Sequence, residues 1–205
     1  MDRATSAEII RLLRKRYGKV KPALDYRSVY ELCIAVVLSA QTTDRQVNLV
    51  TPELFRLYPD ATALAKAPVA KLERIVQSTG FFRMKAKHIS QLAKTVAEKF
   101  GGEIPSNRAS LESLPGVGRK SANVILSQGF GVQAMAVDTH VGRLARRLGY
   151  TVSENPLIVE RDLCSFIPEK DWTEAHLLLI THGRTICTAR KPDCRGCPVS
   201  KLCPT

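Results

Sequence analysis

The chain has no long hydrophobic run, and this absence argues against a protein built on membrane-spanning helices. Such a helix needs roughly 18 uninterrupted apolar residues, whereas the best apolar segment, 32–40, is far shorter. Residues 1–4 lead into an amphipathic segment rather than into the apolar core of a signal peptide. We therefore expect a cytoplasmic protein that does not bind membranes.

Signals for β-structure are also scarce. The chain contains no Asn-Gly or Asp-Gly dipeptide, although these are the strongest short-range signals for a β-hairpin. Valine-rich pieces such as 35–38 lie inside longer segments with a helical pattern. We therefore expect an all-α fold.

Acidic residues are in short supply. The chain has 31 lysines and arginines against 19 acidic residues, which gives a net charge of +12. Such an excess favours a polyanionic partner with salt-dependent affinity; a generally basic surface without a partner is the alternative. The length of 205 residues allows one substantial core or two small ones.

Apolar residues recur at spacings of three and four along most of the chain, and this period predicts helices. Thr43 and Gln46 form a plausible capping box, and Pro52 and Pro68 are expected in first helical turns. The expected helical segments are 9–17, 29–38, 43–50, 53–58, 69–77, 85–100, 108–113, 119–128, 139–148, 156–164 and 172–182.

The segment 114–120, Leu-Pro-Gly-Val-Gly-Arg-Lys, predicts a tight turn that opens a helix. Pro115 ends the preceding helix, while Gly116 and Gly118 permit positive φ and leave the backbone bare. A bare loop that runs into a helix N-terminus presents N–H groups suited to phosphate. Lys120 lies in the first turn, where the helix dipole disfavours the ammonium form and makes a neutral amine more accessible. This combination predicts chemistry on nucleic acid.

Four of the six cysteines lie near the C-terminus in the pattern Cys187-x6-Cys194-x2-Cys197-x5-Cys203. Disulfides are not expected in a cytoplasmic chain. Structural zinc sites usually pair cysteines at spacings of two to four residues, and only one spacing here is that short. The pattern therefore favours a larger metal cluster over zinc. Cys33 and Cys164 stand alone in apolar segments and are expected to be small buried hydrophobes.

These motifs together resemble a known family. The turn 114–118 resembles the hairpin of helix-hairpin-helix DNA-binding proteins. With Lys120, Gly129-Phe-Gly131 and Val137-Asp-Thr-His140, it is similar to the signature of a DNA glycosylase superfamily. The cysteine pattern and the segment 38–44 are similar to the endonuclease III branch. The matches run from about residue 29 to Cys203 and so cover most of the chain.

The resemblance implies a bifunctional enzyme that removes oxidised pyrimidines from duplex DNA and cleaves the abasic site by β-elimination. A neutral lysine amine can attack C1′ and form a Schiff base with the opened sugar, and the resemblance gives Lys120 this role. It gives Asp138 the roles of proton acceptor and of stabiliser for the sugar cation. Asp138 is also expected to cap the helix that follows it, and the two roles are compatible.

The resemblance also implies how the DNA is held. Gln41 is expected to fill the gap left by the extruded base, and Phe81 to wedge against the orphaned partner base. Phe82 is the alternative wedge. The loop 188–193, which lies between the first two of the four cysteines, carries the basic pair Arg190 and Lys191, which is suited to binding phosphate. The remaining expected DNA contacts are Gly116, Val117, Gly118, His140, Arg190 and Lys191, with the footprint extended by Arg143, Arg146, Arg147 and Arg184 unless these lie on a solvated face.

The implied molecule has two lobes, with the active site in the cleft between Lys120 and Asp138. A six-helix barrel would cover 22–133, and a domain with a [4Fe–4S] cluster would unite 1–21 with 134–205. We expect a monomer that binds double-stranded DNA containing damaged bases or abasic sites. The alternatives are a related glycosylase with uracil or mismatch preference, an abasic-site lyase with weak glycosylase activity, a non-catalytic DNA-binding protein, and an electron-transfer protein.

Overall fold

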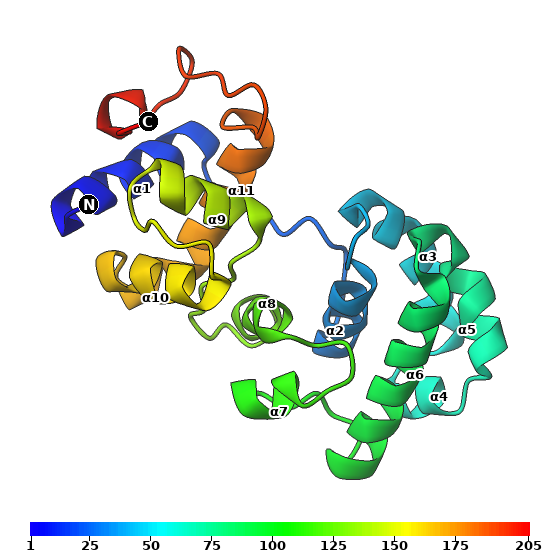
Figure 1. The fold of residues 1–205 in the computed structure, drawn as a ribbon. Coiled ribbons are helices and arrows are strands. Elements are labelled where there is room, and N and C mark those ends of the chain that lie inside the picture. Colours follow the sequence, from blue (N-terminus) through cyan, green and yellow to red (C-terminus); the bar gives the residue numbers. More distant parts are fainter. The chain divides into compact units, whose positions relative to one another are not determined.

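The computed structural model describes residues 1–205 and contains helices but no strand, which confirms the expected all-α fold (Figure 1). The chain divides into two compact units, one formed by 22–131 and the other by 1–21 together with 132–205. The first of these units ends at residue 131, whereas the sequence predicted a barrel lobe that ends at residue 133. None of the helices combines the length and apolar character that crossing a membrane requires.

The unit 22–131 is organised around α2, Val29–Leu38, whose side chains are almost all buried. A helix that is apolar on every side is stable only when other elements surround it, and α2 contacts α3, α6 and α8. The other elements of this unit are α3 (Asp44–Leu57), α4 (Ala61–Ala65), α5 (Val69–Val76), the 3-10 helix η1 (Gln77–Thr79), α6 (Phe82–Lys99), α7 (Arg108–Glu112) and α8 (Arg119–Gly129).

The second unit joins the N-terminal helix to the last third of the chain. One apolar cluster contains Ile9 and Leu13 from the first helix and Leu144, Leu163 and Leu178 from later ones. Cys187, Cys197 and Cys203 pack against its edge. The elements are α1 (Arg3–Tyr17), α9 (Thr139–Arg147), α10 (Pro156–Phe166), η2 (Glu169–Asp171), α11 (Trp172–Thr185) and η3 (Ser200–Leu202).

The prediction of separate helices over 43–50 and 53–58 is wrong, because α3 continues through Pro52. Val47, Val50 and Leu54 form one buried stripe on either side of the proline. Burial of that continuous face outweighs the loss of one helical hydrogen bond at Pro52. Pro68 is likewise outside the first helical turn, since it occupies the N-cap position of α5.

The start of α3 follows the predicted capping box only in part. The Thr43 hydroxyl accepts a hydrogen bond from the Gln46 backbone N–H at 3.2 Å. The Gln46 side chain does not close the box, because its Nε2 donates to Ser78 Oγ at 2.7 Å. This bond ties the start of α3 to η1, which is distant in the sequence.

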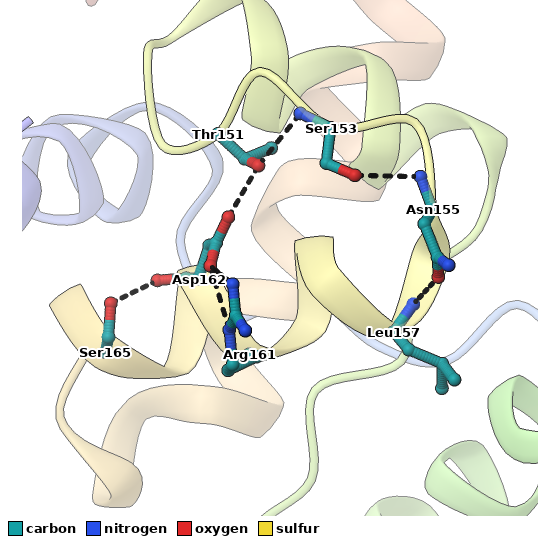
Figure 2. Close-up of polar contacts among 7 residues, drawn as sticks. All are labelled: Thr151, Ser153, Asn155, Leu157, Arg161, Asp162 and Ser165. Carbon is teal, nitrogen blue, oxygen red and sulfur yellow. Dashed lines mark hydrogen bonds and ion pairs between the residues drawn. The ribbon is translucent and has the colours of Figure 1, made fainter.

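A ladder of hydrogen bonds fixes the loop that enters α10 (Figure 2). The Thr151 hydroxyl donates to Asp162 Oδ2 at 2.6 Å and accepts from the Ser153 N–H at 3.1 Å. The Asn155 N–H donates to Ser153 Oγ at 3.1 Å, and Asn155 Oδ1 caps α10 by accepting from the Leu157 N–H at 2.9 Å. The bond from Thr151 holds the pKa of Asp162 below its usual value. The loop after α9 is thereby held in one conformation.

Candidate active site

The hairpin between α7 and α8 is built around one glycine with positive φ. Gly116 has φ +81°, whereas Gly118, which was also expected to use positive φ, is extended with φ −97°. A Cβ on Gly116 would lie 3.0 Å from Val37 Cγ1 and 3.2 Å from His88 Cβ. Glycine at 116 therefore serves both the turn and the close approach of the hairpin to α2 and α6.

The hairpin exposes its glycines and buries its valine. Val117 is only 5% exposed, and its N–H donates to the Leu114 carbonyl at 3.0 Å. This N–H is therefore already paired and is not among the several N–H groups that the hairpin can offer to a phosphate. Gly116 and Gly118 are exposed, and no side chain caps the α8 N-terminus that Gly118 precedes. The bare backbone that can approach a phosphate thus lies at these two glycines and at the start of α8.

Lys120 is half-buried in the first turn of α8, as the sequence predicts. One turn further along, the fully buried Asn123 accepts a hydrogen bond through Oδ1 from Arg108 Nε at 3.1 Å. This bond joins α7 to α8 across the hairpin. This pair was not predicted from the sequence, although a polar residue within the apolar run 121–126 was a signal for it.

Gln41 and Phe81 share an unusual backbone conformation. They are the two non-glycine residues with positive φ, at 52° and 46°. Such a conformation is costly for a bulky residue, and it clusters at functional sites. Phe81 is 61% exposed, whereas Phe82 is half-buried with the Arg83 guanidinium 5.5 Å from its ring centroid. The exposed aromatic side chain of this pair is therefore Phe81.

Asp138 is the N-cap of α9, which is the structural role expected for it. Its Oδ1 accepts hydrogen bonds from the N–H groups of His140 and Val141, both at 2.9 Å. The cap thus uses one carboxylate oxygen and leaves Oδ2 out of this arrangement. His140 Nδ1 lies 3.3 Å from Nη2 of Arg143. Asp138 is half-buried and belongs to the unit 1–21 with 132–205.

The four C-terminal cysteines line one cavity of about 180 Å3, together with Leu144, Leu148, Ile186, Pro192 and Val199. All four are free thiols. No three His, Cys, Asp or Glu side chains converge closely enough to hold a single metal ion. Four cysteine sulfurs around one cavity are a donor set that can hold a metal-containing group.

Two nitrogen groups face the sulfurs of this cavity. Arg147 Nη1 donates to Cys187 Sγ at 3.3 Å, and His182 Nε2 lies 3.5 Å from Cys197 Sγ. Burial lowers the pKa of His182 to about 4 and raises the pKa of the Cys197 thiol. The neutral imidazole therefore adds no positive charge beside the Cys197 sulfur.

Arg143 and Arg147 hold the backbone of the cysteine loop rather than forming a solvated basic face. Arg143 Nη2 donates to the carbonyls of Gly183 and Cys187 at 2.8 and 3.0 Å. Arg147 donates to the carbonyls of residues 188 and 189 at 2.8 and 3.0 Å. The DNA contacts expected of these two arginines stay a prediction beside this role within the fold. Arg190 and Lys191 at the loop tip are exposed.

Comparison with known proteins places this architecture in a family. A model of the HhH-GPD superfamily of base excision DNA repair proteins matches residues 34–169. Endonuclease III of Synechocystis sp. is 48% identical over 205 residues, which are 100% of this chain and 93% of that protein. The chain belongs to the endonuclease III family. Its membership confirms the resemblance inferred from the hairpin and the cysteine pattern.

Two solved structures from the endonuclease III family have the same fold as this chain. One is a non-covalent endonuclease III–DNA complex, and the other is a trapped endonuclease III–DNA covalent intermediate described as an estranged-adenine complex. Each matches with a TM-score of 0.95 at 40% identity, covering 100% of this chain and 96% of the other. As a member of this family, the chain is a base excision repair enzyme, a DNA glycosylase and abasic-site lyase.

Proposed function

We propose that this enzyme removes oxidised pyrimidines from duplex DNA and cleaves the abasic product by β-elimination, with Lys120 as nucleophile and Asp138 as proton acceptor. The observation that carries the proposal is the position of Lys120 in the first turn of α8, close behind the exposed glycine Gly118. A helix start that no side chain caps can bind a DNA phosphate. It thereby brings the lysine amine to the sugar next to that phosphate.

The chemistry assigned to Lys120 requires its neutral amine. The nitrogen lone pair forms a bond to C1′ as the glycosidic bond breaks, and the base leaves with the electron pair of that bond and takes up a proton. The nitrogen then loses a proton to Asp138, and its lone pair forms the C=N bond of the Schiff base as the C1′–O4′ bond breaks and O4′ takes up a proton, which opens the sugar ring. Removal of a proton from C2′ finally expels the 3′ phosphate. The trapped covalent intermediate known for a relative is in keeping with this route.

Asp138 would accept the proton from the amine and stabilise positive charge on the sugar. Its two hydrogen bonds from the start of α9 go to Oδ1. They fix the orientation of the carboxylate, while Oδ2 can take a proton without loss of the cap. Capping and catalysis therefore use different oxygens of one side chain.

Gln41 and Phe81 are the residues we propose to occupy the vacated base stack. An extruded base leaves a gap that costs a few kcal/mol in lost stacking, and a polar filler and an aromatic wedge reduce this cost. The positive φ of both residues and the exposure of Phe81 support the proposal. We propose backbone contacts to phosphate at Gly116 and Gly118.

We further propose that the four C-terminal cysteines hold a [4Fe–4S] cluster in the cavity they line. A cluster of this kind, once bound, supplies a rigid anchor for the loop 188–193 and hence for its basic tip. The unit 1–21 with 132–205 would then be the cluster domain and 22–131 the barrel domain. We propose that the enzyme acts in the reducing cytoplasm, where cysteines stay available as metal ligands.

Purified protein should contain about four iron atoms per chain, as one [4Fe–4S] cluster requires. Cys197→Ala should lose the yellow-brown colour and most of the iron, and much of this variant should be insoluble. Cys33→Ala is the matched control and should keep its iron, because Cys33 is buried in α2. Plasma mass spectrometry measures the iron content of both variants. A fully active preparation that contains zinc and no iron would contradict the cluster assignment.

Replacing both Arg190 and Lys191 with Ala should weaken binding to damaged and undamaged duplex alike, because contacts to phosphate carry no sequence information. The slope of log affinity against log salt should become shallower by about 0.9 for each DNA phosphate that these side chains neutralise. Titrations by fluorescence anisotropy at several salt concentrations measure this. Lys94→Ala with Lys99→Ala, on the exposed side of α6, is the charge-matched control. Loss of affinity for damaged DNA alone would show that the loop contacts the lesion instead.

The substrate is tested with a panel of duplexes that each contain one oxidised pyrimidine, one uracil, one mismatch or one abasic site. We expect base release and strand cleavage at the oxidised pyrimidines and cleavage at the abasic site. Excision of only uracil or mismatched bases would overturn the substrate assignment. Cleavage of only the abasic site would reduce the enzyme to a lyase.

A further inference from the structure

Lys85 on α6 is the only lysine whose side chain is buried, with 2% of its surface exposed. Burial of an ammonium group is costly unless its hydrogen bonds are satisfied. Lys85 Nζ donates to the backbone carbonyl of Thr79 at 2.7 Å. Burial also lowers the pKa of Lys85. Because this ammonium is enclosed, it is not available to a DNA phosphate, and its presence calls for another explanation.

The carbonyl that Lys85 holds lies directly before the strained turn that carries Phe81. Thr79 is followed by two successive residues with positive φ, Gly80 at 68° and Phe81 at 46°. Such a turn persists only where its surroundings hold it in place. On the preceding side Thr79 is itself buried, and its hydroxyl donates to the Val76 carbonyl at 2.7 Å.

Lys85 forms hydrogen bonds to the backbone of this turn at both of its ends. Its side chain binds the carbonyl of Thr79, before the strained pair, and its own backbone N–H donates to the carbonyl of Phe81 at 3.1 Å. Phe81 is left 61% exposed. Burying an exposed aromatic ring against apolar neighbours lowers the free energy. The side chain therefore stays exposed only if the backbone of the turn 79–81 is held in its conformation.

We propose that Lys85 is a positioning residue that holds the turn 79–81 so that Phe81 projects from the surface, ready to enter the stack beside the orphaned base. The proposal rests on the wedge role proposed for Phe81 and deepens it. A wedge held in its bound conformation before DNA arrives loses less entropy on binding. The enzyme thereby gains selectivity for duplexes in which a base can be displaced.

The test uses the full-length enzyme and a duplex with a stable abasic analogue opposite 2-aminopurine, whose fluorescence reports stacking of the orphaned base. Lys85→Met removes the ammonium and keeps a similar apolar stem. We expect its preference for the abasic duplex over undamaged duplex to fall by about tenfold, the scale of one base–aromatic stacking interaction. The fluorescence change should approach that of Phe81→Ala. Lys94→Met removes an exposed cation from the same helix and should match the wild type.

A double-mutant cycle separates positioning from general stability. If Lys85 acts through Phe81, Lys85→Met in the Phe81→Ala background should change the preference by less than about twofold. An equal loss in both backgrounds would overturn the inference, and so would a wild-type response from Lys85→Met alone. If Phe81→Ala itself leaves the fluorescence response unchanged, the wedge assignment is wrong, and that failure is distinct from a failure of the role of Lys85.

Lys85→Arg keeps the inference testable if Lys85→Met is insoluble. Arginine retains a charged donor, but its larger planar group must displace the Thr79 carbonyl. We expect a smaller loss of preference than for methionine, and this loss should vanish in the Phe81→Ala background. A loss that persists in that background would overturn the inference.

Discussion

Lys120→Gln should reduce strand cleavage at an oxidised pyrimidine to background and leave binding to the lesion nearly unchanged. Glutamine keeps the polar, extended character of the side chain, but its amide is not a nucleophile and cannot form a Schiff base. The hairpin and its glycines, which we propose to hold the phosphate, are untouched. Single-turnover cleavage on denaturing gels and anisotropy titrations measure the two quantities separately.

Lys94→Gln makes the same change on an exposed surface of α6 and should cleave at the wild-type rate. The wild-type rate should fall as the pH is lowered, because protonation of the Lys120 amine removes the lone pair that attacks C1′. Unimpaired cleavage by Lys120→Gln would mean that another amine performs the chemistry.

Asp138→Asn should lower base excision by about two to four orders of magnitude, the range for loss of an acid–base group or of charge stabilisation. The side-chain oxygen of asparagine can still accept from the N–H groups of His140 and Val141, so the cap of α9 and the melting temperature should be preserved. Cleavage of a pre-formed abasic site should suffer less, because no base has to leave. Comparison of the two substrates under single-turnover conditions measures this difference.

Asp138→Ala separates the two roles of this carboxylate. Alanine removes the cap as well as the charge, and loss of an N-cap costs about 1 kcal/mol of stability. Asp138→Ala should therefore be both inactive and less stable, whereas Asp138→Asn should be only inactive. Normal excision by Asp138→Asn would remove Asp138 from the chemistry and leave it with a structural role.

The helices could be predicted from the sequence wherever a local period and a local cap agree. The segments that became α8 and α9 begin at the residues where glycine and aspartate predicted them. The local rule failed at Pro52, because the buried face of α3 depends on what packs against it. The short helix α4 was missed; it begins after Asp60, which accepts a capping hydrogen bond from the Ala63 N–H at 2.8 Å.

The candidate site could be predicted from the sequence only in part, because some of its residues depend on contacts with distant elements. Lys120 and Asp138 could be predicted from local motifs, since Lys120 follows a glycine hairpin and Asp138 opens a helix. The roles of Arg147 and Lys85 depend on backbone carbonyls supplied by other elements. In a sequence both residues look like ordinary surface cations. Only the folded structure distinguishes a solvated side-chain cation from one that donates hydrogen bonds to a loop backbone.

The role of Lys120 as nucleophile is tested by trapping the enzyme on lesion-containing DNA with borohydride and locating the adduct by mass spectrometry of the digested complex. Borohydride reduces a Schiff base to a stable amine, so the modified peptide identifies the nucleophile. The wild type should carry the adduct on Lys120, and Lys120→Gln should form none. An adduct on the N-terminal amine or on Lys191, or undiminished trapping of Lys120→Gln, would show that Lys120 is not the nucleophile.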